Sequence, residues 1–200
     1  MTRQEMKARA KQQLGGSIFG NEWMMALAVL LVEGAILGAA ASITSGIGTL
    51  ILAGALGVGV AIAFLGQMRT GAIRFENMFD GFKNDFGGNL LLGLMMGIFE
   101  FLWSLLFVIP GIVKSYSYAM SYYIKADNPD YGWNDCIQAS MELMDGHKWE
   151  LFVLDLSFIG WYIVGGLCFG IGTLWVAPYH MATRTQFYES IKHQPQMIDA

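Results

Sequence analysis

The 200-residue chain is 54% hydrophobic and only 14% charged, and its mean hydropathy is +0.44. Average soluble domains carry about 25% charged residues, so this chain has too few to cover a surface that faces water on all sides. The composition excludes an ordinary soluble domain and predicts an integral membrane protein whose surroundings are the lipid bilayer. The formal net charge of -4 excludes nothing by itself. No nucleic-acid motif or basic array is present, so no nucleic-acid partner is expected.

Six segments with few charges predict membrane-spanning helices. A hydrocarbon core about 30 Å thick needs about 20 residues of helix at 1.5 Å each. Backbone polar groups in hydrocarbon need partners within the chain, which favours helices as the spans. The expected fold class is therefore all-α, a polytopic membrane bundle of six upright transmembrane helices. The predicted spans are Trp23–Ile43, Thr49–Gln67, Asn89–Ile109, Ile112–Lys125, Glu150–Cys168 and Thr173–Ser190; the fourth is short and the sixth contains Pro178.

A pattern of an apolar residue, a spacer and a glycine recurs at an interval of 65 residues and ends at Gly16, Gly81 and Gly146. After each glycine comes a long apolar stretch that glycine or proline interrupts once. Self-similarity at a fixed period predicts repeated structural units. The sequence therefore predicts a single integral membrane domain, 1–200, made of three helical hairpins in units of about 1–66, 67–130 and 131–195.

Each hairpin is expected to follow an amphipathic surface helix. In the third unit Trp133, Ile137, Met141 and Met144 recur at helical spacing, which is typical of a helix lying in the headgroup region or against the bundle. Ordinary connecting segments between spans are the alternative. The corresponding apolar positions of the other units are Met6, Ala10 and Leu14 in the first, and Met68, Ile73, Phe75 and Met78 in the second.

The positive charges indicate an orientation. With a cytoplasmic N-terminus, six spans place eleven of the twelve Lys and Arg residues near the cytoplasmic face and only Lys114 near the outer face. The positive-inside rule then predicts that both termini are cytoplasmic. A cleaved signal peptide ending at 39–41 is the competing interpretation, which Glu33 and the long basic leader disfavour. Cys136 on the inner side and Cys168 near the outer side are not expected to pair.

Small residues in the second predicted span favour close helix packing. Helix backbones approach closely where small residues recur every four positions. We interpret the pattern as packing within one chain rather than as a dimer seam, and the sequence predicts no oligomeric state. The pattern consists of two series in the second span, Ala53, Gly57 and Ala61, and Ala55, Gly59 and Ala63. Matching grooves are expected at Gly34 and Gly38 in the first span and at Gly93 and Gly97 in the third.

Four segments between Phe79 and Lys192 carry a family resemblance: FDGFK at 79–83, LWSLLFVIPGIVKSYSYAMSYYIKADNPD at 102–130, ASMELMDGHKWELFVLDLSFIGW at 139–161 and GIGTLWVAPYHMAT at 170–183. They resemble an uncharacterised bacterial family of small multi-pass membrane proteins, the domain of unknown function 975. The chain is also similar to the membrane domain attached to some glycerophosphodiester phosphodiesterases. The resemblance implies an integral helical fold in the bacterial inner membrane and no established activity, so no catalytic residue is carried over.

Ionisable residues inside the predicted spans form the candidate site. Glu33 and Glu100 fall mid-way along the first and third spans, and Asp155 about a turn and a half into the fifth. A charge at the bilayer centre costs about 2.5–3.5 kcal/mol on insertion scales, so each acid is expected to be neutral, paired or in a wet cavity. The fourth span is too polar to face lipid and is expected to line an interior. The candidate intramembrane polar site comprises Glu33, Glu100, Lys114, Tyr118, Asp155, His180 and Arg184.

Three functional interpretations follow, and a packing network without a further role is the alternative for the polar residues. The first is a non-enzymatic permease-like or transport-accessory component for a small solute or peptide. The second is a membrane scaffold whose cytoplasmic surface helices bind a soluble protein partner, or which organises lipid; a membrane domain associated with lipid-headgroup metabolism is a third. No HExxH, Gly-x-Ser-x-Gly or phosphate-loop motif is present, and Asp145, His147 and Glu150 fit no standard metal site. Neither an enzyme nor a cofactor is expected.

Overall fold

The computed structural model describes residues 2–44, 47–106, 108–167 and 170–192. Within these ranges the chain is all-helical and contains no strand, as the sequence predicts. Gly46 and Cys168, at two expected outer turns, lie outside the described residues. The helices are α1 (Arg3–Gln13), α2 (Asn21–Thr44), α3 (Ile47–Thr70), the 3-10 helix η1 (Phe75–Phe79), α4 (Asp80–Lys83), α5 (Phe86–Leu106), α6 (Val108–Tyr118), α7 (Ser121–Asp127), α8 (Trp133–Leu143), α9 (Lys148–Leu167) and α10 (Ile171–Lys192).

Four of these helices, α2, α3, α5 and α9, are long and apolar enough to cross a membrane. The sequence predicted six spans. The expected fourth span is divided between α6 and α7, which have 11 and 7 residues. The expected sixth span is α10, which runs for 22 residues through Pro178 but carries many polar side chains in its C-terminal half. Length and composition thus identify four membrane-type helices.

The fourth predicted span is interrupted at 119–120. Ser140 of the neighbouring helix α8 lies at this break and is fully buried. The Met120 backbone N–H donates to Ser140 Oγ at 3.2 Å, and Ser140 Oγ donates to the Ser117 carbonyl at 2.8 Å. A side chain that partners freed backbone groups makes a helix break tolerable inside a protein. The prediction of one continuous helix over 112–125 was therefore wrong.

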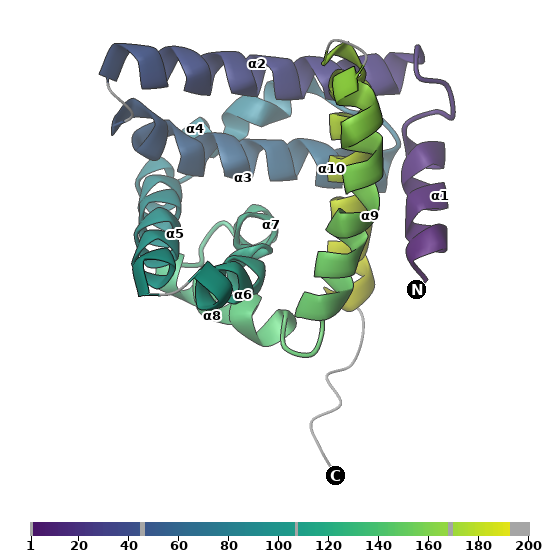
Figure 1. Cartoon of the computed structure of the whole chain (residues 1–200). Helices are drawn as coiled ribbons and strands as arrows, with labels where there is room; N and C mark the ends of the chain where they lie inside the picture. The colour runs from purple at the N-terminus through teal and green to yellow at the C-terminus, as the bar shows by residue number, and fades with distance from the viewer. Residues whose placement is uncertain (1, 45–46, 107, 168–169, 193–200) are drawn as a thin grey trace.

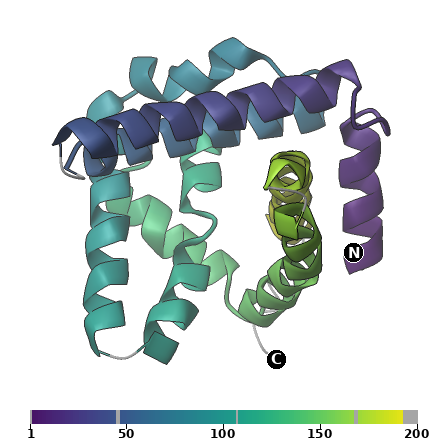
Figure 2. The same ribbon diagram turned by 45° about the horizontal axis from the view of Figure 1, so that its top comes forward.

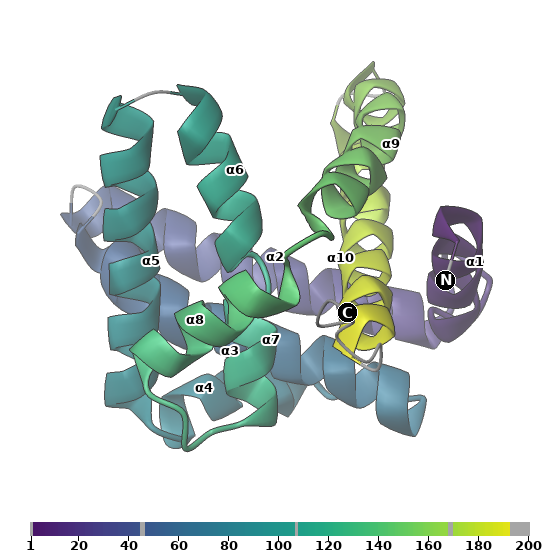
Figure 3. The same ribbon diagram turned by 90° about the horizontal axis from the view of Figure 1, so that it is seen from below.

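The helices form three adjacent pairs, α2 with α3, α5 with α6, and α9 with α10. Figures 1, 2 and 3 show α2 and α3 running across every view, nearly perpendicular to the other two pairs. The expected bundle of upright helices is therefore not what the structure contains. A steep crossing requires only one point of closest backbone approach, which glycine makes available.

The central helix is α3. In its most apolar stretch 61% of the residues are buried, compared with 17% in α2 and 22% in α5 and in α9. Two glycines make its crossing with α5, because a Cβ on Gly93 would lie 2.5 Å from the Gly54 Cα atom. Gly34 and Gly38 of α2, by contrast, have open space around them, and a Cβ on either would meet no atom within 4 Å. The predicted packing groove on α2 is thus open, whereas that on α5 is occupied at Gly93.

The apolar stripes of α1 and α8 face the interior. Met6, Ala10 and Leu14 are buried against α10 and its neighbours, and Ile137 and Met144 are buried beneath α8. The second predicted surface helix is absent from its expected position. There α3 continues to Thr70, and η1 and α4 follow a turn at Gly71, whose φ is +81°. The first and third predicted units therefore follow the expected order of surface helix and hairpin more closely than the second unit does.

The three recurring glycines serve two different purposes. Gly16 and Gly146 adopt left-handed backbone conformations, with φ of +71° and +77°, where glycine carries no Cβ penalty. Gly81 lies within α4, and a Cβ there would come within 2.0 Å of the Ala55 carbonyl oxygen of α3. Glycine thus permits a left-handed turn at Gly16 and Gly146, and close packing against α3 at Gly81.

Candidate intramembrane polar site

Asp155 of α9 is the centre of a polar cluster that the sequence predicted in part. Its Oδ1 atom accepts hydrogen bonds from His180 Nε2 at 2.8 Å and from Arg184 Nε at 3.0 Å. Its Oδ2 atom accepts a hydrogen bond from the Tyr116 hydroxyl of α6 at 3.1 Å and another from the second guanidinium nitrogen of Arg184. Both carboxylate oxygens therefore have two donors each.

The surroundings fix the orientation of the His180 ring. An ionised carboxylate only accepts hydrogen bonds, so Nε2 carries a proton, and Nδ1 lies 3.2 Å from the Tyr162 hydroxyl oxygen. Phe158 stacks on the imidazole at a centroid distance of 4.5 Å. His180 and Arg184 share one face of α10 because they are four residues apart. The cluster joins α6, α9 and α10 and leaves no oxygen of Asp155 open to a ligand.

Glu33 and Glu100 differ from Asp155 in having no protein partner. Each side chain is half-buried, Glu33 mid-way along α2 and Glu100 near the C-terminal end of α5. No hydrogen bond or ion pair joins either carboxylate to another residue in the described part of the chain. Tyr122 of α7 interacts electrostatically with both carboxylates, and Tyr118 with Glu100. The two acids thus share a neighbourhood of tyrosines rather than of cations.

Lys114 and Tyr118 lie apart from the Asp155 cluster. The Lys114 ammonium sits over the Trp103 ring, 5.1 Å from its centroid, which is a cation–π arrangement. Tyr118 is buried and packs against Phe99, with ring centroids 6.3 Å apart. The structure therefore separates the seven predicted site residues into four groups: Asp155 with its partners His180 and Arg184, the two open acids, Lys114 over the Trp103 ring, and the buried Tyr118.

Sequence reasoning did not find the two acids that connect the last residues of α7 with their neighbours. Asp127 bonds to Arg69, Tyr188 and Lys192, with Tyr188 Oη at 2.9 Å. Burial would raise the pKa of Asp127, but the hydrogen bonds from Lys192, Arg69 and Tyr188 lower it below its ordinary value. Asp85 bonds to the buried Lys125 at 2.6 Å, and this hydrogen bond lowers the pKa of Asp85. The Asp-Asn-Pro-Asp turn at 127–130 was the local signal for a structured element here.

The described residues form an all-helical fold in which four helices are long and apolar enough to cross a membrane and in which a polar cluster joins α6, α9 and α10. These features indicate the class of membrane protein. Residues 106–195 match the family model described as Protein of unknown function (DUF975). The match covers the Asp155 cluster and the turn after α7. No curated protein and no solved structure matches the chain.

Proposed function

We propose that the protein is a non-enzymatic, permease-like or transport-accessory component of the cell membrane, in which Glu33 and Glu100 exchange protons or a small cation. The observation that carries the proposal is the missing partner of these two acids on membrane-type helices. A charged group in hydrocarbon is costly and marks ion or proton pathways when it is retained. Acids left open can take up and release a proton or cation.

The contrast with Asp155 supports this assignment. A carboxylate that already accepts four hydrogen bonds gains little from a ligand and resists losing its partners, because breaking a buried ion pair leaves an uncompensated charge. We therefore assign Asp155, His180 and Arg184 to packing of the α9/α10 pair. Glu33 and Glu100, flanked by Tyr122, have oxygen atoms available for exchange.

We further propose that all three helix pairs lie in the membrane, with both termini in the cytoplasm. The distribution of Lys and Arg supports this orientation. A six-span topology also requires that α2 and α3 turn relative to the other pairs, about their contact at Gly54 and Gly93, since in the structure they run nearly perpendicular to them. The same turn is required if only α2, α3, α5 and α9 span the membrane, because α2 and α3 run across α5 and α9.

The scaffold alternative has less support. A helix that docks a soluble partner must present its apolar stripe to solvent, but the stripes of α1 and α8 are buried against the rest of the protein. Docking at these helices would require them to detach. The open acids carry the transport proposal without such a rearrangement.

The proposal is tested with the full chain reconstituted in liposomes that contain a pH-sensitive dye. An imposed potassium diffusion potential should drive proton entry above the level of empty vesicles, and Glu33→Gln and Glu100→Gln should each reduce it to that level. Glu76→Gln, in an exposed position of η1, is the matched control and should leave the flux unchanged. Wild-type flux equal to that of empty vesicles, or undiminished flux in both variants, would contradict the proposal. Thermal melting of each variant separates loss of exchange from loss of folding.

A further inference from the structure

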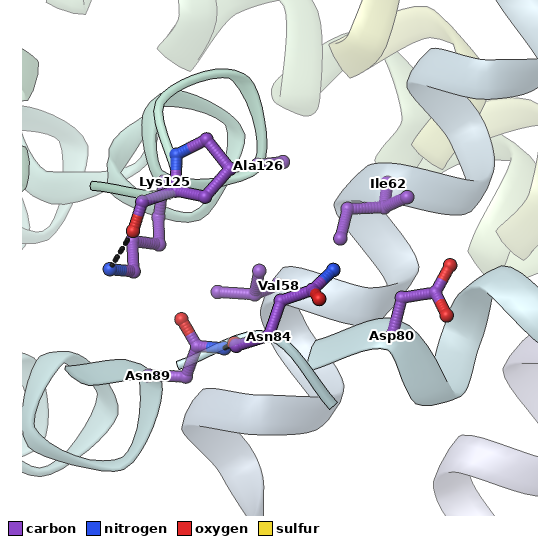
Figure 4. Close-up of a pocket in the computed structure, with 8 residues that line it drawn as sticks. Val58, Ile62, Asp80, Asn84, Asn89, Lys125 and Ala126 are labelled. Carbon is purple, nitrogen blue, oxygen red and sulfur yellow. Dashed lines mark hydrogen bonds between the residues drawn. The ribbon is translucent and has the colours of Figure 1, made fainter. Parts of the chain in front are cut away.

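A small cavity lies away from the membrane carboxylates, where α3, α4, α5 and the end of α7 meet (Figure 4). Its volume is about 170 Å³. Val58 and Ile62 of α3 form an apolar wall, and Asp80, Asn84 and Asn89 supply polar groups. A dry cavity of about 150 Å³ is known to hold a molecule the size of benzene, so this one has room for a small organic molecule.

Asn89 contributes an unused acceptor to this cavity. Its side chain is only 1% exposed. Nδ2 donates to the Gly81 carbonyl at 2.7 Å and to the Asn84 carbonyl at 2.9 Å, which fixes the orientation of the amide. Oδ1 is buried and accepts no hydrogen bond from any residue that the structure describes. In Figure 4 this oxygen points away from Asn84, toward the side on which Lys125 lies. A buried acceptor without a donor is unfavourable, so the cavity should supply one.

Lys125 does not supply that donor. Its ammonium group is occupied by Asp85 Oδ2 at 2.6 Å, the Tyr131 carbonyl at 2.7 Å and the Pro129 carbonyl at 2.8 Å. An ammonium has three hydrogens, and all three are used. Its charge is compensated by Asp85. The lysine therefore closes one side of the cavity as a fixed structural group.

The remaining polar groups make the cavity rich in acceptors. The Asp80 carboxylate binds Lys83 on its exposed side, at 3.0 Å, and also lines the cavity. Together with Asn89 Oδ1 it offers negative potential and lone pairs to an occupant. The wall formed by Val58 and Ile62 offers apolar contact to the rest of that occupant.

We propose that this cavity is a binding site for a small primary amine in its ammonium form. The ammonium donates to Asn89 Oδ1, the Asp80 carboxylate adds negative charge on the other side of Asn84, and a short alkyl group packs on Val58 and Ile62. The site is independent of the exchange proposed for Glu33 and Glu100. It takes donor-bearing molecules and rejects ligands that only accept hydrogen bonds.

Isothermal titration of the full chain in nanodiscs with ethylammonium tests the proposal, with acetate as the acceptor-only comparison. Ethylammonium should bind with one site per chain and acetate should not bind. Asp80→Asn and the cavity-filling Ala126→Leu should each weaken binding at least about tenfold, which corresponds to about 1.4 kcal/mol. Asp130→Asn, an exposed acid that does not line the cavity, is the control and should bind as the wild type does. The proposal would be overturned if ethylammonium did not bind saturably, with water as the only occupant of the cavity. It would also be overturned if Asp80→Asn bound ethylammonium as tightly as the wild type does. Because Asp80→Asn is isosteric, it decides between these outcomes even where Ala126→Leu does not fold.

Discussion

The side chain of Lys125 is 1% exposed, and its ammonium group donates hydrogen bonds to three acceptors. Two of them are carbonyls of the turn that follows α7, and the third is Asp85 before α5. The lysine thus fixes the position of that turn relative to α5 and closes the cavity beside Asn89. Buried charges are tolerated when they are paired and fully hydrogen-bonded, which is the condition that Lys125 meets.

Lys125→Met should therefore destabilise the protein strongly. Asp85 is half exposed and can turn to water, so most of the cost comes from the Pro129 and Tyr131 carbonyls that lose their donor, about 1–3 kcal/mol each. Lys83→Met removes an exposed pair with Asp80 and should cost less than about 1 kcal/mol. Thermal unfolding in detergent, followed by circular dichroism, compares the two. Similar melting temperatures for both variants would show that the Lys125 network adds no stability.

At the scale of the elements, the crossing of α3 over α5 organises the interior. The backbones of the two helices meet at Gly54 and Gly93. Asn89, one turn earlier in α5, and Gly81 of α4 also approach the α3 backbone closely. Because backbone atoms form these contacts, no side chain can rotate aside to admit an additional methyl group. The contact sets the spacing of the two helices where they cross.

Gly93→Ala should separate these helices. The added Cβ would lie 2.5 Å from Gly54 Cα, and overpacking of this kind costs about 1–3 kcal/mol. Gly97→Ala, one turn further along α5, is the matched control. Its Cβ would meet only Leu50 Cδ2 at 3.7 Å, and alanine favours the helix by about 0.5–1 kcal/mol. Urea unfolding in mixed micelles should show a loss of stability for the first variant and none for the second. Equal stability of the two variants would contradict close backbone packing at this crossing.

Sequence alone predicted the properties that depend on local composition. Long apolar runs predicted helices and a membrane environment. The four-residue spacing of His180 and Arg184 predicted a shared face that could pair with an intramembrane acid, but it did not decide between Glu33, Glu100 and Asp155. The break at 119–120 depends on Ser140, twenty residues later in the chain. The burial of Lys125 depends on backbone carbonyl groups, whose positions cannot be predicted from the residue types that carry them. Such features arise from tertiary contacts and could not be predicted from local pattern.

At the scale of the whole molecule, much apolar surface faces outward. Ile163 and Leu167 near the end of α9 are 59% and 80% exposed, and Phe101 and Leu105 of α5 are 66% and 73% exposed. In Figure 3 the α5/α6 and α9/α10 pairs extend beyond the α3 core. The four exposed residues belong to the C-terminal parts of α5 and α9. Large exposed apolar patches mark membrane or protein contacts. We assign this surface to contact with lipid.

That assignment is tested most directly by spin labels on outward-facing positions of three membrane-type helices, Leu31→Cys of α2, Leu102→Cys of α5 and Ile163→Cys of α9, in nanodiscs. We predict that dissolved oxygen collides with each label more often than a water-soluble nickel chelate does. A label at Glu76→Cys should show the reverse. Preferential collision of the chelate with the labels on α2, α5 and α9 would mean that water surrounds these helices, and would contradict their placement in the bilayer.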